Sequence, residues 1–146
     1  MMSQPVEILL VEDNEDDVVI IQEAFVESLL INVISTVRDG EEALAYLRRE
    51  GKYNDVSLPG LVLLDINMPK KNGFEVMQAI RADPRLRSLP VIMLTTSDRD
   101  EDIIRSYANG ACSYIQKPVV LDHFHTVIKQ FEMYWTMTSR IPLHHP

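Results

Sequence analysis

Short apolar runs that end in acidic residues are the feature that most constrains this chain. Ile8-Leu9-Leu10-Val11 is followed by Glu12-Asp13, and Leu61-Val62-Leu63-Leu64 is followed by Asp65. Continuous runs of branched apolar residues are typical of parallel strands that are buried on both faces. Two such strands in one sheet would bring three carboxylates to the same edge. Because these carboxylates repel one another, the pattern predicts a cation at that edge.

Apolar runs of this kind alternate with longer segments of helical spacing, which indicates repeated βα units around a parallel sheet. We predict an α/β fold with a doubly wound, five-stranded parallel sheet. The expected strands run from Glu7 to Val11, Asn32 to Val37, Leu61 to Leu64, Val91 to Thr95 and Ser113 to Gln116. The expected helices begin near Asp16, Glu41, Gly73, Arg99 and Val120.

Composition argues against several classes of protein. The chain has 146 residues without a break in composition, so we expect one domain over 1–146. The formal net charge of -8 would repel DNA and anionic lipid, and we expect neither as a partner. No apolar stretch is long enough to cross a bilayer, the N-terminus lacks signal-peptide features, and Cys112 is the single cysteine. We therefore expect a cytoplasmic protein.

Polar residues that could take part in binding or catalysis gather where the predicted strands end. In an open parallel sheet, ligands bind beyond the carboxyl ends of the strands. The residues that end a predicted strand or directly follow one are Glu12, Asp13, Asp65, Thr95 and Lys117. The sequence therefore predicts one functional site built from these side chains.

Four segments in a fixed order resemble the receiver domain of two-component response regulators. They are Leu10-Val11-Glu12-Asp13-Asn14, Leu63-Leu64-Asp65-Ile66-Asn67-Met68-Pro69, Leu94-Thr95-Thr96 and Lys117-Pro118. The resemblance covers about 5–131 and leaves an extended last helix and tail at about 132–146. It implies a flavodoxin-like (βα)5 receiver that accepts a phosphoryl group on Asp65 from a sensor histidine kinase. Such a protein signals through altered protein–protein interaction, and its own catalysis is limited to phosphotransfer and slow autodephosphorylation.

The acidic residues suit a magnesium-dependent phosphoacceptor. An ionised aspartate needs no general base, so Asp65 can attack phosphorus directly if its charge is screened. Mg²⁺ prefers octahedral oxygen coordination with some water retained. We expect side-chain ligands from Asp13 and Asp65, the backbone carbonyl of Asn67, and Glu12 acting through water.

Lys117 and Thr95 are the expected partners of the phosphoryl oxygens. Lys117 offers a compact charge with three donors, and Thr95 offers a hydroxyl. The alternative is a surface lysine and a β-branched residue that merely ends a strand. The resemblance further implies that Pro118 follows a cis peptide bond in a turn after Lys117.

Three more positions take their expected roles from the resemblance alone. Tyr114 matches the aromatic that turns inward while Thr95 moves toward the phosphoryl group, although a half-buried packing role is the ordinary reading of such a tyrosine. Asn67 and Ser97 lie where receivers tune the path of hydrolytic water.

Two features narrow the subfamily. A long connection runs from Arg49 to Pro59, and the last helix continues through Phe131 to Trp135. Both resemble phytochrome-associated response regulators, so we expect a phytochrome as the sensor kinase and an unidentified downstream protein. The apolar tail at Ile141-Pro142-Leu143 favours a homodimer through the last helices and the tail.

Two other functions remain open on the sequence. One is a receiver that does not switch and serves as a dimerisation or docking scaffold. The other is a phosphohydrolase of the haloacid dehalogenase type, whose chemistry requires a second acid two residues after the nucleophile. Asn67 occupies that position, which disfavours the hydrolase.

Overall fold

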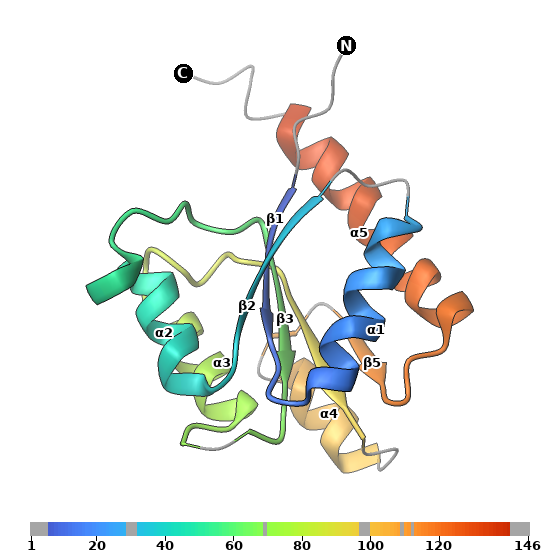
Figure 1. Ribbon diagram of the computed structural model, residues 1–146, viewed down its shortest axis with the longest axis horizontal. Coiled ribbons are helices and arrows are strands. Elements are labelled where there is room, and N and C mark those ends of the chain that lie inside the picture. The colour runs from blue at the N-terminus through green and yellow to red at the C-terminus, as the bar shows by residue number, and fades with distance from the viewer. Residues whose placement is uncertain are drawn as a thin grey trace.

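Five parallel strands form one sheet in the order β2-β1-β3-β4-β5 (Figure 1). The computed structural model describes residues 6–28, 32–68, 70–96, 100–108, 110–111 and 113–140, with the side chains of all but 100, 104 and 134–140. The strands are β1 (Val6–Val11), β2 (Asn32–Val37), β3 (Leu61–Asp65), β4 (Val91–Thr95) and β5 (Ser113–Gln116). This strand order confirms the predicted doubly wound sheet of flavodoxin type.

Helices cover both faces of the sheet. They are α1 (Glu15–Val26), α2 (Gly40–Arg48), α3 (Gly73–Ala82), α4 (Asp100–Ala108) and α5 (Leu121–Arg140), with a short 3₁₀ turn, η1 (Gly51–Tyr53), after α2. One hydrophobic cluster packs α1 and α5 on the sheet, and a second cluster packs α2 and α3 on the other face. Helix α4 lies against β5, and its Arg105 guanidinium stands 4.0 Å from the centre of the Phe74 ring in α3.

The alternation of side chains explains why the strand sequences are apolar throughout. Along β1, Ile8 and Leu10 join the cluster under α1 and α5, while Leu9 and Val11 join the cluster under α2 and α3. Successive residues of a strand point to opposite faces, so a sheet covered on both faces needs apolar residues at every position. The apolar runs of the sequence are therefore predictive of these strands.

The register of the strands brings their carboxyl ends to one edge. Val11 pairs with Leu64, Asp65 with Leu94, and Thr95 with Gln116. The backbone N–H of Lys117 donates to the carbonyl of Thr95 at 2.7 Å, which continues the ladder past β5. The residues that follow these strand ends therefore lie beside one another in space.

Polar caps start the helices close to where the sequence predicted. Asn14 caps α1, Asp39 caps α2, and Asn72 caps α3 in a capping box with Glu75. Each cap oxygen accepts a backbone N–H that would otherwise lack a partner in the first helical turn. Each helix consequently begins within one residue of its predicted start.

The long connection after α2 is ordered against that helix. Arg49 ends α2 in the left-handed conformation with φ of 56°, a position usually taken by glycine. The Tyr53 ring of η1 then packs 5.0 Å from the Tyr46 ring, and its hydroxyl donates to Glu42. These contacts attach the connection to the α2 face of the domain.

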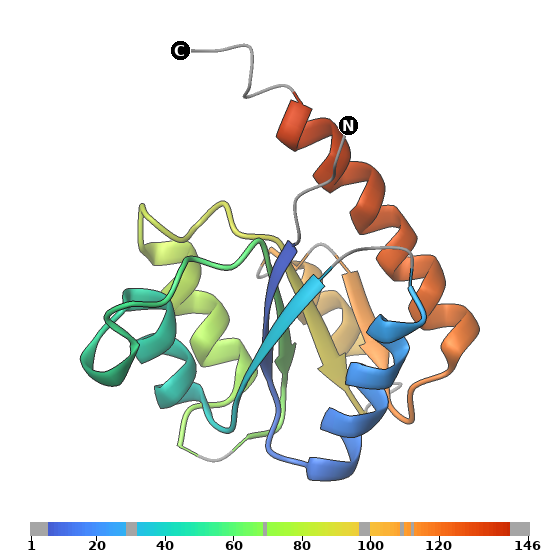
Figure 2. The ribbon, with the colours of Figure 1, turned by 45° about the horizontal axis from the view of Figure 1, so that its top comes forward.

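Helix α5 continues past the end of the sheet that is opposite the strand carboxyl ends (Figure 2). Its first half packs on the sheet through Phe124, Val127, Ile128 and Phe131, and Met133 is exposed. Among the described residues, no helix is both long enough and apolar enough to cross a membrane.

Candidate functional site

Three carboxylates meet at the carboxyl edge of the sheet. Glu12 and Asp13 follow β1, and Asp65 is the last residue of β3. One oxygen from each of the three lies within 4.8 Å of the others. Glu12 and Asp65 are buried, with 0% and 4% exposure, whereas Asp13 is exposed. The structure thus brings together the acidic set that the sequence predicted.

Lys117 is the cation at the centre of this group. Its ammonium nitrogen lies 2.5 Å from Glu12 Oε1 and 3.4 Å from Asp65 Oδ2. The side chain is nearly buried, which contradicts the alternative of a solvated surface lysine. The peptide bond between Lys117 and Pro118 is cis. The predicted lysine therefore lies inside the acidic cluster.

The structure adds Asp17, which sequence reasoning missed. Asp17 lies in the first turn of α1, and its Oδ2 is 3.1 Å from the ammonium nitrogen of Lys117. Asp17 is one of three consecutive acidic residues in the first turn of α1, and nothing in the sequence separates it from Glu15 and Asp16. Its contact with Lys117 comes from the way α1 packs on the sheet.

Burial and charge crowding change the acidity of the site. Burial, followed by the negative charge of Glu12, raises the pKa of Asp65 from 3.8 to about 7, while Lys117 and the Asn67 N–H act in the opposite direction. The Asn67 N–H donates to Asp65 Oδ1 at 3.2 Å. Burial alone would lower the pKa of Lys117, but its contacts with the surrounding carboxylates outweigh burial and raise it.

These observations fit a divalent cation. The cluster carries more carboxylates than Lys117 can neutralise, and the raised pKa of Asp65 shows that its ionised form is under-compensated. Carboxylate oxygens are the ligands that hard cations prefer. The exposed Asp13 leaves the cluster accessible from solvent. A cation placed here would relieve the repulsion between the buried carboxylates.

Thr95 and Tyr114 lie on the strands next to the acidic cluster. Thr95 ends β4, directly beside the strand of Asp65, and is 2% exposed. Tyr114 in β5 is half-buried, with its ring 6.1 Å from the Tyr107 ring of α4 and 6.5 Å from the His123 ring of α5. Tyr114 therefore connects β5 to both neighbouring helices.

The structure says less about the two positions predicted to tune hydrolysis. The side chain of Asn67 is exposed at the edge of the site, and this position therefore holds no second buried acid. Ser97 lies outside the described residues. Their expected effect on hydrolysis stays a prediction.

Close backbone packing holds the loop that follows Asp65. The Gly73 N–H donates to the carbonyl of Ile66 at 2.8 Å. A Cβ at Gly73 would lie 2.5 Å from the Asp65 carbonyl oxygen, so only glycine lets α3 start this near the end of β3. The same loop passes Gly40, where a Cβ would lie 2.3 Å from the Lys71 carbonyl oxygen.

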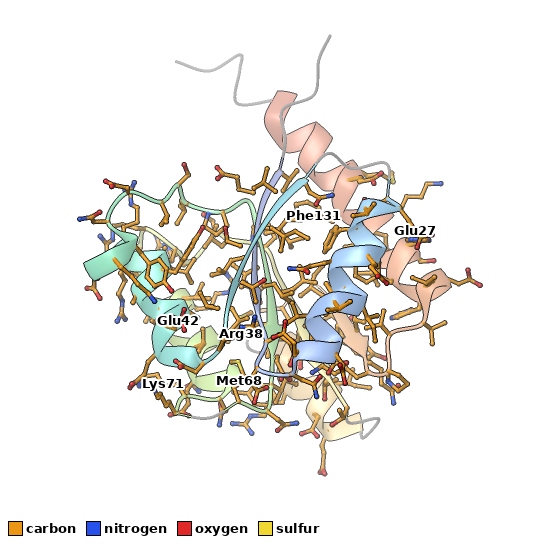
Figure 3. All side chains as sticks on the ribbon, in the orientation of Figure 1. Glu27, Arg38, Glu42, Met68, Lys71 and Phe131 are labelled. Atoms are coloured by element: carbon orange, nitrogen blue, oxygen red, sulfur yellow. The ribbon has the colours of Figure 1, made fainter. Side chains whose placement is uncertain are left out.

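Basic residues lie at the same end of the molecule as the carboxylate cluster, after β2 and in the loop after β3. Arg38 pairs with Glu15 at 2.5 Å, and Lys70 lies 3.5 Å from Asp39. Figure 3 places Arg38, Met68 and Lys71 at the same end of the molecule as the acidic site. This end of the molecule therefore carries basic side chains as well as the carboxylate cluster.

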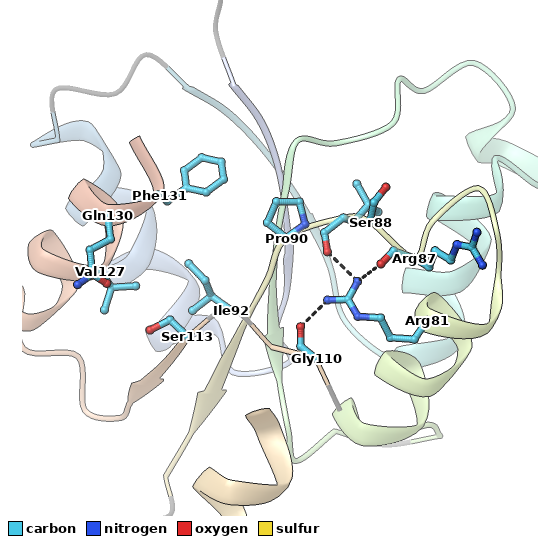
Figure 4. A pocket seen from close by; sticks show the side chains of 11 residues that line it. Arg81, Arg87, Ser88, Pro90, Ile92, Gly110, Ser113, Val127, Gln130 and Phe131 are labelled. Atoms are coloured by element: carbon cyan, nitrogen blue, oxygen red, sulfur yellow. Dashed lines mark hydrogen bonds between the residues drawn. The ribbon is translucent and has the colours of Figure 1, made fainter. Parts of the chain in front are cut away.

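A hollow of about 480 Å³ lies at the opposite end of the sheet, and no carboxylate side chain is among the residues that line it (Figure 4). The Arg81 guanidinium donates to the carbonyls of Arg87, Leu89 and Gly110 at 2.6, 2.9 and 2.6 Å. Because these bonds use the guanidinium to join two loops, Arg81 serves the packing of that end.

Comparison with known proteins agrees with this geometry. The family model of the response regulator receiver domain matches residues 8–129. The chain belongs to the response regulator receiver family. It is a receiver of two-component signalling, a phosphoacceptor protein, and the order of strands and the acidic site are those the resemblance implied.

Three relatives show where this receiver stands within the family. The chain is 37% identical to response regulator Rcp1 of Synechocystis sp. over 138 residues, which is 94% of each chain. It is 41% identical over 139 residues to FilR2 of Methanothrix harundinacea, named as a probable methanogenesis regulatory protein, covering 94% and 88%. The phosphorylated cyanobacterial phytochrome response regulator RcpA has a TM-score of 0.79 at 44% identity, covering 92% and 96%.

One solved structure bears on the metal. The Mn²⁺-bound form of Rcp1 superposes with a TM-score of 0.77 at 37% identity, covering 90% of this chain and 94% of that one. In the present chain, the cluster of Glu12, Asp13 and Asp65 is the group suited to a metal ion among the described residues.

Proposed function

We propose that Asp65 is the residue that accepts the phosphoryl group, and that the donor is the phosphohistidine of a sensor histidine kinase. A carboxylate oxygen of Asp65 attacks phosphorus, a P–O bond forms, and the P–N bond to the histidine breaks. The observation that carries this proposal is the placement of Asp65 at the end of β3, with oxygens of two further carboxylates within 4.8 Å and the Lys117 ammonium nitrogen 3.4 Å away.

Magnesium is the proposed resident cation. Glu12, Asp13, Asp65 and the backbone carbonyl of Asn67 would hold it, with Glu12 acting through water. Bound Mg²⁺ supplies neutralisation of charge on the phosphoryl oxygens. The chain's own part is to present Asp65 ionised and correctly oriented, which the Asn67 N–H supports by its bond to Asp65 Oδ1.

Lys117 and Thr95 are the proposed contacts of the remaining phosphoryl oxygens. Phosphoryl transfer passes through a loose transition state, so fixed cations and donors act mainly by positioning and electrostatic stabilisation. Both side chains are buried next to Asp65. Because they are already fixed in place, little rearrangement of protein or water is needed during the reaction. Pro118 follows Lys117 in the turn that presents it.

Signal transmission is proposed to run through Thr95 and Tyr114. Tyr114 contacts α4 and α5 through its ring neighbours, so a change in its position would alter the surface formed by those helices. Asn67 and Ser97 are the proposed tuning positions for the attack of hydrolytic water. A partner protein that reads the altered surface is the proposed output.

A phytochrome is the proposed sensor kinase. The long, ordered connection after α2 and the 20-residue α5 support this, as does similarity to RcpA. The comparable identity to FilR2 shows that sequence similarity alone does not select the kinase. Phosphotransfer from a purified phytochrome kinase, compared with an unrelated kinase, tests the assignment. Rapid transfer from the unrelated kinase and none from the phytochrome would overturn it.

A homodimer through α5 and the tail is proposed as the assembly. Helix α5 projects past the sheet and exposes Met133 there (Figure 2). An exposed apolar side chain on a helix that projects beyond the domain core favours burial against another subunit, and the tail at 141–146 lies outside the described residues. Sedimentation velocity should show a dimer at micromolar concentration, and a strict monomer before and after phosphorylation would overturn the proposal.

The test of the phosphoacceptor is transfer of label from a phosphorylated kinase. Label should appear on the wild-type receiver and disappear with Asp65→Asn, while Asp55→Asn on the exposed connection serves as the control. Wild-type protein that takes no label from any kinase or small phosphodonor would favour a scaffold that does not switch.

A further inference from the structure

The first turn of α1 carries three consecutive acidic residues with different surroundings. Glu15 pairs with Arg38, Asp16 is exposed, and Asp17 lies beside Lys117. Acidic residues at a helix N-terminus are favourable for the helix dipole alone. That general effect needs no contact with the site, so it does not account for the position of Asp17, whose side chain is 19% exposed.

The ammonium group of Lys117 is divided among three carboxylates. It lies 2.5 Å from Glu12 Oε1 and 3.1 Å from Asp17 Oδ2, within hydrogen-bonding distance of both. Its distance to Asp65 Oδ2 is 3.4 Å, which is longer than an ordinary N–H···O bond. In this structure Lys117 is therefore held more closely by Glu12 and Asp17 than by the proposed phosphoacceptor.

We propose that Asp17 is a positioning residue that competes with Asp65 for Lys117. This inference rests on the proposed function of Asp65 and Lys117. Phosphorylation adds negative charge and acceptor oxygens at Asp65, which draw Lys117 away from α1. Asp17 resists that displacement, because Lys117 gives up a charge-assisted contact when it moves. Asp17 consequently lowers the stability of the phosphorylated state relative to the resting state.

Two ligands separate this role from a structural one. Asp17→Asn removes the competing charge and keeps the side-chain size. Beryllofluoride, a mimic of the phosphoryl group, should bind Asp17→Asn with saturating Mg²⁺ about threefold to tenfold more tightly than wild type. Mg²⁺ alone should bind about twofold to fivefold more weakly, because a nearby negative charge is lost. Simple loss of structure would weaken the binding of both ligands together.

Matched variants make the test specific. Asp16→Asn removes the same charge from the same helical turn, and its exposed side chain should leave both affinities within about twofold of wild type. Asp17→Glu keeps the charge and should restore wild-type behaviour. In a Lys117→Ala background, Asp17→Asn should lose its effect on beryllofluoride, since the lysine through which it acts is gone.

Calorimetric titration of each variant with Mg²⁺ and with beryllofluoride decides the question. The inference is overturned if Asp17→Asn weakens the binding of both ligands or leaves both affinities unchanged. It is also overturned if Asp17→Asn has the same effect on beryllofluoride binding in the Lys117→Ala background. Wild-type protein that fails to bind beryllofluoride, or binds it equally after Asp65→Asn, refutes the proposed function and this inference together. Binding that depends on Asp65 but not on Asp17 refutes this inference alone.

Discussion

Replacing Asp65 by asparagine should stabilise the metal-free protein, although it removes the central residue of the site. Burial and the negative charge of Glu12 raise the pKa of Asp65 from 3.8 to about 7 in the folded state. The folded protein therefore binds more protons than the unfolded chain between about pH 4 and pH 7. Across that window the free energy of unfolding falls as pH rises, and Asp65→Asn removes this loss.

The size of the effect follows from the pKa shift. A change from 3.8 to about 7 is roughly three units, and each unit corresponds to about 1.36 kcal/mol. Ionised Asp65 therefore costs the metal-free fold about 4 kcal/mol near pH 8. The attraction between Asp65 and Lys117 is already contained in this shift, so we expect Asp65→Asn to gain up to about 4 kcal/mol near pH 8.

Urea unfolding in the presence of a chelator provides the measurement. The difference in unfolding free energy between Asp65→Asn and wild type should be largest near pH 8 and shrink toward zero as pH falls to about 4. Saturating Mg²⁺ should stabilise wild type and close the gap. Asp55→Asn, at an exposed position, controls for a general change in net charge. A difference that does not depend on pH, or a less stable Asp65→Asn, would refute the electrostatic reasoning.

Three further substitutions test other parts of the structure. Lys117→Ala should destabilise the metal-free protein by about 3 kcal/mol in urea unfolding, because it leaves buried carboxylates without their cation. The variant should retain some phosphorylation while losing the output. Unchanged stability and output would contradict this prediction. Gly73→Ala places a Cβ 2.5 Å from the Asp65 carbonyl oxygen, so we expect a loss of about 1 to 3 kcal/mol and slower phosphorylation by acetyl phosphate, whereas a wild-type rate and stability would show that the loop adapts. Phe124→Ala removes the edge-on contact with Phe25 at 5.0 Å and should cost about 3 to 5 kcal/mol without changing Mg²⁺ affinity in the folded state; altered affinity would show that the α5 face is coupled to the site.

Much of the fold could be predicted because each strand has a simple physical cause. The sheet is covered on both faces, so runs such as Leu61–Leu64 carry no polar alternation and mark the strands directly. Parallel strands then deliver their following residues to one edge, which is enough to bring together Glu12, Asp65 and Lys117. This reasoning applies to residues at strand ends, and it identified the site residues that lie there.

Other features depend on tertiary contacts that no local pattern encodes. Asp17 faces Lys117 because of how α1 is rotated over the sheet, and its acidic neighbours Glu15 and Asp16 carry the same local signal. Arg49 adopts a left-handed conformation that sequence preference assigns to glycine, and the packing of the following connection holds it there. Arg81 reaches carbonyls from two separate loops, one of them 29 residues away.

The central claim is that Asp65 accepts a phosphoryl group with the help of a divalent cation. Intact-mass spectrometry after incubation with acetyl phosphate tests it most directly, with wild type and Asp65→Asn measured in Mg²⁺ and in chelator. The account predicts the added mass of one phosphoryl group on wild type in Mg²⁺ only, and none on Asp65→Asn. An adduct that persists in Asp65→Asn, or no adduct on wild type with acetyl phosphate or with kinases as donors, would contradict it.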